Sequence, residues 1–155
     1  MKRTILHPAG LLAVLLFLFS SLAWANESLK PYILVSNEAG DFSAVVDSTK
    51  NKLTEGGFTI AGEYAPYDGA HAIVVTSDEL QAAASKSEFG GYGAVIRVAV
   101  TKNGDNVEVA YSNPVYWSNA YLLASDGSAI AEKMTAARGK GEPFGSAEGL
   151  TAKQL

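Results

Sequence analysis

The sequence contains no cysteine, and this absence excludes several kinds of site. Disulfides, thiol nucleophiles, iron–sulfur clusters, thiolate zinc sites and lipid attachment through an N-terminal cysteine all require a thiol. Histidine is nearly as scarce, since the 155 residues hold only His7 and His71. A metal site built from several histidines is therefore excluded, and we expect neither a metal nor a cofactor.

Signatures of catalysis and of nucleotide binding are also missing. No serine stands in a Gly-x-Ser-x-Gly elbow, so a hydrolytic triad has no anchoring motif. The glycine-rich residues 89–93 precede an expected strand instead of opening a helix, and no Walker lysine follows them. The 16 acidic residues outnumber the 12 basic ones, which argues against nucleic acid and anionic membrane surfaces as partners.

Residues 1–25 have the three-part layout of a secretory signal peptide. Two basic residues follow the initiator methionine, residues 11–22 are almost wholly apolar, and an Ala-Trp-Ala sequence ends at Ala25. The alternative is an uncleaved membrane anchor, but a span needs roughly 20 apolar residues. We therefore predict cleavage after Ala25, a single mature domain over residues 26–155, a periplasmic or secreted location, and no membrane span after cleavage.

The mature chain alternates β patterns with amphipathic helices. Apolar residues between Phe42 and Leu53 recur at helical spacing, with Asp41 as the N-cap and Gly56-Gly57 as the stop. The order βαββαββα predicts an α+β fold, an antiparallel-rich sheet with helices packed on one face in a ferredoxin-like sandwich. The expected strands cover residues 32–36, 58–63, 72–75, 94–102 and 106–112, and the expected helices begin near 41, 76 and 128.

Asn103-Gly104 is the strongest hairpin signal in the chain, because a type I′ turn needs positive φ at both central positions. With these two residues as the loop, Val98 faces Val109 and the apolar residues of both strands share one face. Arg97 then lies on the other face of the hairpin.

The C-terminal residues 148–155 have the pattern of a helix start, with Thr151 as the N-cap, yet the sequence stops within the first turn. Either the tail is frayed or the domain is C-terminally incomplete, and we favour the second interpretation.

The succession of strand, helix, Gly57-Phe58 junction, two strands, short helix and hairpin resembles the uncharacterised family known as domain of unknown function 302. The resemblance covers roughly residues 32–123. The Asn-Pro-x-Tyr run within residues 113–121 is similar to an extended periplasmic branch of that family. The resemblance implies a small α+β fold and a homodimer formed through the sheet, and it brings no established activity or catalytic residues.

Aromatic residues cluster after the hairpin. Their rings combine a large contact area with a polar tip, which suits interfaces and shallow ligand clefts. The alternative is that they close the edge of a small core, while Arg97 forms a solvated pair with Glu108. The predicted binding surface consists of Tyr111, Tyr116, Trp117, Tyr121 and Arg97.

His71 is the only base of the mature chain that titrates near neutral pH, and Asp68 and Tyr67 lie just before it. Asp68 could orient His71 for acid–base catalysis or ligand sensing, whereas the plainer interpretation is a hydrogen-bonded histidine at a strand entry. We predict a non-catalytic binding or interaction domain whose partner is a second copy, an unknown small ligand or an envelope protein. A small enzyme centred on His71 and Asp68 is the alternative.

Overall fold

The structure is a computed structural model that describes residues 28–155. The predicted signal peptide lies outside the described residues, so its cleavage stays a prediction. The strands are β1 (Tyr32–Ala39), β2 (Thr59–Tyr64), β3 (Ala70–Thr76), β4 (Ile96–Asn103), β5 (Asn106–Ser112) and β6 (Glu142–Phe144). The helices are α2 (Phe42–Glu55), α3 (Asp78–Ala84), α4 (Pro114–Ala120) and α5 (Ser128–Arg138), with a single 3-10 turn at Gly90–Gly93.

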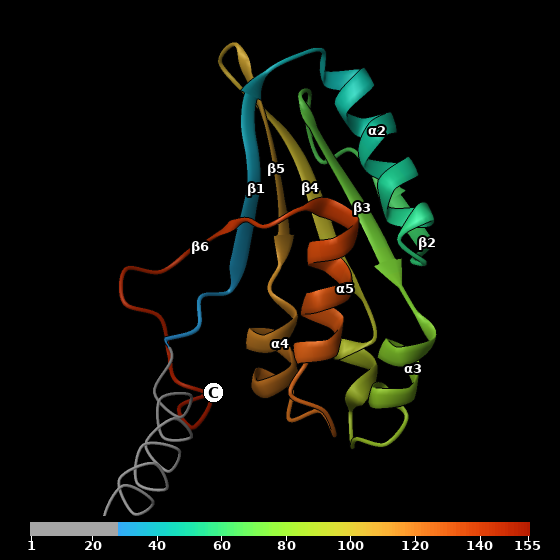
Figure 1. Cartoon of the computed structure of the whole chain (residues 1–155), viewed down its shortest axis with the longest axis vertical. Coiled ribbons are helices and arrows are strands. Elements are labelled where there is room, and N and C mark those ends of the chain that lie inside the picture. Colours follow the sequence, from blue (N-terminus) through green and yellow to red (C-terminus); the bar gives the residue numbers. More distant parts are fainter. Residues whose placement is uncertain (1–27) are drawn as a thin grey trace, which may run out of the picture.

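One six-stranded sheet organises the molecule in the order β2-β3-β4-β5-β1-β6. Every neighbouring pair of strands is antiparallel. Helices α2 and α5 lie against the same face of this sheet, and α3 and α4 lie near its lower end (Figure 1). The predicted α+β architecture is therefore confirmed. Within the described part of the chain, no helix is long and apolar enough to cross a membrane.

Helix α2 follows the predicted pattern closely. Asp41 caps it by accepting a hydrogen bond from the Ala44 amide at 2.8 Å. Its buried stripe consists of Val46, Thr49 and Leu53. The helix carries the chain from β1, which lies next to the β6 edge of the sheet, to β2 at the opposite edge, and its inner face covers strands between them.

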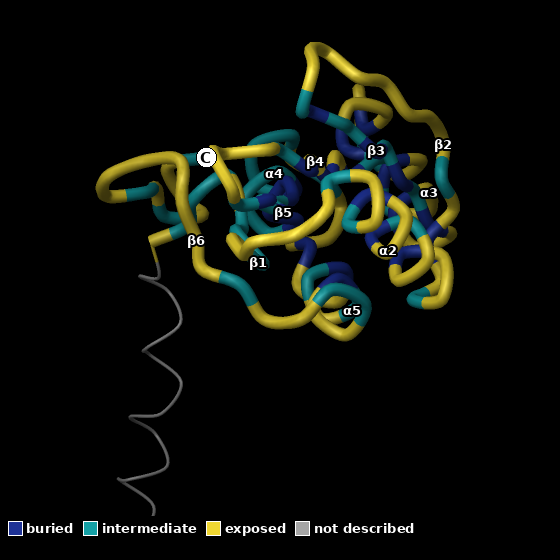
Figure 2. Tube along the Cα trace, turned by 90° about the horizontal axis from the view of Figure 1, so that it is seen from above, coloured by how far each residue is buried: buried dark blue, intermediate teal, exposed yellow. Residues whose placement is uncertain are grey.

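The hydrophobic core lies between the sheet and the helices α2 and α5, where Figure 2 shows the most deeply buried segments. Leu53 from α2 and Met134 from α5 are fully buried there. The strands contribute alternate residues, as expected for a sheet with one covered face. These residues are Ile73, Val75, Ile96, Val98, Val100, Val107, Val109 and Tyr111.

The hairpin of β4 and β5 corrects the predicted register. Val98 pairs with Tyr111, two positions beyond the expected partner Val109. The loop residues are Gly104 and Asp105, with φ of +62° at Gly104 and a negative φ at Asp105. This pattern fits a type II′ turn, which requires glycine only at its first central position. Because a shift of two residues keeps every side chain on its face, the predicted buried set is still correct.

Two elements were not expected from the sequence. Helix α4 occupies the aromatic stretch, where no period was visible, and β6 pairs with β1 at the edge of the sheet. The start of α4 did have a local signal, because Asn113 accepts a hydrogen bond from the Val115 amide and Pro114 occupies the first helical turn.

Candidate functional site

Aromatic rings from four separate segments form a continuous line along one end of the sheet. We call this line the aromatic row. Neighbouring ring centroids in it lie between 5.2 and 6.5 Å apart, within the range of favourable aromatic pairs. Its members, in spatial order, are Phe144, Tyr32, Trp117, Tyr121 and Tyr92, with Tyr116 beside Trp117.

Trp117 fixes the aromatic row to the rest of the fold. Its indole Nε1 donates a hydrogen bond to the Pro31 carbonyl at 2.9 Å. One turn earlier, the side-chain amide of Asn113 donates to the Lys30 carbonyl at 2.8 Å. Helix α4 is therefore tied to the segment that enters β1, and Trp117 is only partly exposed. The exposed rings lie toward the two ends of the row, with Tyr92 70% exposed at one end and Phe144 and its neighbour Tyr32 40% and 41% exposed at the other.

The structure separates Tyr111 from the other predicted binding residues. Its ring lies in the core, only 4% exposed, and burial raises the pKa of its hydroxyl although a hydrogen bond to Thr135 opposes that shift. Tyr111 faces the helices because its strand alternates and its partner Val98 is also buried. The ring of Tyr111 therefore packs in the core and offers little exposed surface to a partner.

The face of the sheet opposite α2 and α5 carries a shallow hollow, which we call the open face. At its centre three alanines, Ala72, Ala99 and Ala110, lie side by side on β3, β4 and β5. Aromatic rings of Tyr64, Tyr32 and Phe144 border these small side chains, and the hollow encloses about 400 Å³. Tyr32 and Phe144 also belong to the aromatic row, so the two surfaces are continuous.

Arg97 and Glu108 provide the charges of the open face. Glu108 accepts hydrogen bonds from the side-chain amides of Asn37 and Asn103, at 3.1 and 2.9 Å. Arg97 is exposed and makes no ion pair with any residue between 28 and 155. The predicted placement of Arg97 on the outer face is therefore confirmed, whereas its predicted solvated pair with Glu108 is not formed.

The structure does not bring Asp68 and His71 together as expected. His71 Nε2 contacts Glu63 Oε2 at 2.8 Å, and Lys50 Nζ contacts the other oxygen of Glu63 at 2.9 Å. Hydrogen bonds from Lys50 and then His71 lower the pKa of Glu63. Asp68 and Tyr67 lie exposed in the turn between β2 and β3. His71 therefore belongs to a polar cluster that links α2 to the edge of the sheet.

Among residues 28–155, no group of three or more His, Asp or Glu side chains is arranged to hold a metal ion.

Comparison with known proteins gives a likeness in fold. No family model matches the sequence, and no curated protein matches it. The structure is similar to the crystal structure of an uncharacterized conserved protein from Bacillus stearothermophilus, described as domain of unknown function 302. The match has a TM-score of 0.59 at 10% identity and covers 69% of this chain and 94% of the other. The chain thus resembles domain of unknown function 302 in fold. At this identity the likeness assigns no activity.

Sequence reasoning identified the middle of the aromatic row but left Tyr32, Phe144 and Tyr92, which complete it, out of the predicted binding surface. Tyr32 was assigned to a strand, and Phe144 lies in a three-residue strand that showed no periodic pattern. For Tyr32 the sequence did contain a signal, because alternation along a strand places its side chain on the same face of β1 as Leu34, two residues later.

Proposed function

We propose that this chain is a non-catalytic binding domain whose binding surface is the open face together with the aromatic row, and whose partner is a second copy of the chain. The observation that carries the proposal is the open face itself. Small side chains occupy its centre and large rings its border, so that another flat surface can approach closely. Exposed apolar surface bordered by polar groups is typical of protein interaction sites.

The distribution of charge favours a second copy over an unrelated partner. Arg97 and Glu108 lie on opposite sides of the three alanines, on neighbouring strands. A two-fold axis through the alanines can place Arg97 of each copy against Glu108 of the other. An interface of this kind is self-complementary, as a symmetric dimer requires. Each Arg97, which has no ion pair within the described chain, would gain one.

The alternative of a small enzyme loses its proposed pair, because His71 contacts Glu63 and not Asp68. The ion pair of Glu63 with Lys50 gives this cluster a structural role at the sheet edge. We therefore propose no reaction.

Sedimentation velocity over a range of concentrations tests the dimer directly. We expect wild type to dimerise, Arg97→Glu to shift the equilibrium toward monomer by placing like charges together, and Arg97→Glu with Glu108→Arg to restore the dimer. Lys140→Glu is the control, because it makes the same charge change on an exposed residue outside the open face. A wild type that stays monomeric at every concentration would overturn the proposal.

We also propose that the domain is exported, on the support of the leader pattern in residues 1–25. Intact-mass measurement of the protein recovered from cells should give a chain that begins at Asn26. A chain that retains its leader and stays with the inner membrane contradicts this part of the proposal.

A further inference from the structure

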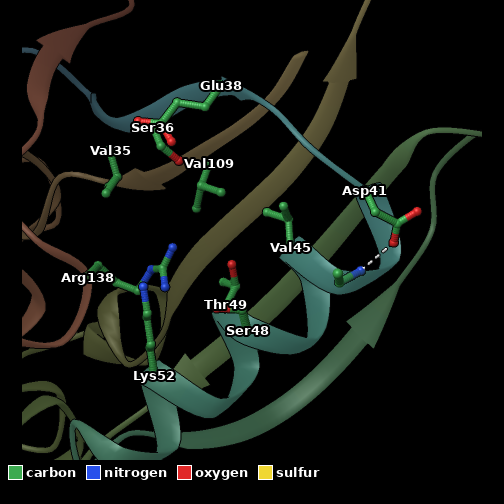
Figure 3. A pocket seen from close by; sticks show the side chains of 11 residues that line it. Val35, Ser36, Glu38, Asp41, Val45, Ser48, Thr49, Lys52, Val109 and Arg138 are labelled. Carbon is green, nitrogen blue, oxygen red and sulfur yellow. Dashed lines mark hydrogen bonds between the residues drawn. The ribbon is translucent and has the colours of Figure 1, made fainter. Parts of the chain in front are cut away.

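A second hollow lies on the helix-bearing side of the sheet, away from the open face. It encloses about 390 Å³ between β1, β5 and α2. Arg138, the last residue of α5, directs its guanidinium into this pocket beside Thr49 and Lys52 of α2 (Figure 3). Two helices distant in sequence, α2 and α5, therefore bring polar groups to one place.

Several of these polar groups have no partner. Nε and Nη1 of Arg138 are buried and make no hydrogen bond within the described chain. The hydroxyl of Thr49 is in the same situation, and Thr49 is 0% exposed. Native proteins pair nearly all buried polar groups, so these two guanidinium nitrogens and this hydroxyl are exceptional, although Arg138 as a whole is only partly buried. These donors are therefore arranged as a receptor for an acceptor group.

The electrostatic environment agrees with this geometry. Burial lowers the pKa of Arg138, because it removes water from around the guanidinium. An anion bound against Arg138 would form charge-assisted hydrogen bonds with it.

The remaining walls restrict which anion fits. Val35, Val45 and Val109 give the pocket an apolar side. The carboxylates of Glu38 and Asp41 also line it, with Glu38 across the pocket from Arg138 (Figure 3). These carboxylates would repel a dianion such as phosphate more strongly than a singly charged anion. A ligand with one negative charge and an apolar body can bind the guanidinium with its charge and pack its apolar part against the valines. Small-molecule sites commonly combine an apolar lining with a few polar groups in this way.

We propose that this pocket binds a small organic monocarboxylate, with its carboxylate on Arg138 and Thr49 and its apolar body against the valines. The site is independent of the dimer, since the open face lies on the other side of the sheet. Arg138 and Thr49 act as binding residues, and Lys52 adds positive charge at the rim.

Titration with isovalerate, followed by ¹H–¹⁵N NMR of the folded chain, tests the proposal. We expect saturable shifts at the Thr49 amide and at the Arg138 Nε–H signal. Isovaleramide has the same shape without the charge, and inorganic phosphate has charge without the apolar body. Both should give much smaller shifts, and stronger binding of either would overturn the assignment to a monocarboxylate.

Two variants separate a binding role from a structural one. Arg138→Gln should weaken isovalerate binding at least about tenfold, the effect of one lost charge-assisted hydrogen bond. It should also raise the melting temperature of the ligand-free protein, because two buried nitrogens without hydrogen-bond partners are removed. Thr49→Val should weaken binding without lowering the melting temperature, since a methyl group replaces an unpaired hydroxyl of similar shape.

Lys140→Gln provides the matched control, because it removes one positive charge two residues beyond Arg138 and outside the pocket. It should leave isovalerate binding and the melting temperature unchanged. If isovalerate gives no saturable shift in the wild type and Arg138→Gln lowers the melting temperature, Arg138 is structural and the proposal is wrong.

Discussion

Trp117 combines two roles that are usually separate, and its contacts show how they coexist. Its ring stacks on Tyr121 and meets Tyr116 and Tyr32, while its Nε1 donates to the Pro31 carbonyl. A tryptophan can do both because it has an apolar body and a single polar donor. The ring thus supports the exposed ends of the aromatic row without being the most exposed member itself.

Two substitutions at Trp117 distinguish the contribution of its ring from that of its hydrogen bond. Trp117→Phe keeps a stacked ring but loses the donor to Pro31, and should lower the free energy of unfolding by about 1 kcal/mol. Trp117→Ala removes the centre of the aromatic row and should cost about 3 kcal/mol, at the lower end of the range for large rings because Trp117 is partly exposed. Urea denaturation measures both. If the two variants lose the same free energy of unfolding, the ring contacts of Trp117 do not add to the stability of the fold.

Tyr111 and Trp117 show where residue-level reasoning from sequence succeeds and fails. Both are aromatic and six positions apart, so composition cannot tell which one is buried. Strand alternation does decide it, because Tyr111 continues the buried series of Val107 and Val109. This alternation was visible in the sequence. Tyr111 was nevertheless grouped with the binding surface because many aromatic residues lie near it in the sequence. The contact between His71 and Glu63 depends on the pairing of β2 with β3, which the sequence leaves open.

At the scale of elements, the hairpin shows what a turn signal can and cannot specify. The sequence Asn103-Gly104-Asp105 allows either Asn103-Gly104 or Gly104-Asp105 as the loop, since both place glycine at a positive φ. The side-chain pattern cannot choose between them, because both registers bury the same valines. Helix α4 was missed for a different reason: a seven-residue helix is too short to show a period, although its cap was readable.

Gly104 is the residue on which the hairpin turn depends. Its φ of +62° is unfavourable for a β-branched side chain, although no atom lies within 4 Å of the position a Cβ would take. Gly104→Val should therefore lower the free energy of unfolding by roughly 1–3 kcal/mol through backbone strain alone. Gly104→Asn should cost less, because asparagine tolerates this region. Thermal unfolding of both variants tests the positive φ assigned to Gly104. Equal losses of stability in the valine and asparagine variants would contradict that assignment.

For the whole molecule, three ionised carboxylates hold elements together at different points of the fold. Glu79 on α3 binds Lys133 on α5 with Nζ–Oε2 at 3.0 Å, and Asp126 accepts hydrogen bonds from the amide and hydroxyl of Ser128 at the start of α5. Glu63 connects β2 to α2 and β3. The position of α5, which carries Arg138 to its pocket, therefore depends on two of these carboxylates.

These contacts predict that acid weakens the fold. The Ser77 hydroxyl, the Glu79 backbone amide and Lys133 lower the pKa of Glu79 from 4.5 to about 2, and the backbone amide of Ser128 lowers the pKa of Asp126. A carboxylate with a lowered folded pKa contributes stability above its unfolded pKa and loses it as the pH falls through the folded value. For Glu79 this window runs from pH 4.5 down to about pH 2.

The melting temperature should accordingly fall between pH 5 and pH 2, with a flatter dependence in Glu79→Gln. Glu79 is exposed, so solvent screening limits its pair with Lys133 to about 1 kcal/mol or less at neutral pH. Differential scanning calorimetry across this range measures the slope, and Glu88→Gln, the same change at another exposed glutamate, is the control. If Glu79→Gln and Glu88→Gln flatten the acid slope equally, Glu79 contributes nothing specific and its pair with Lys133 does not help to hold α5 in place.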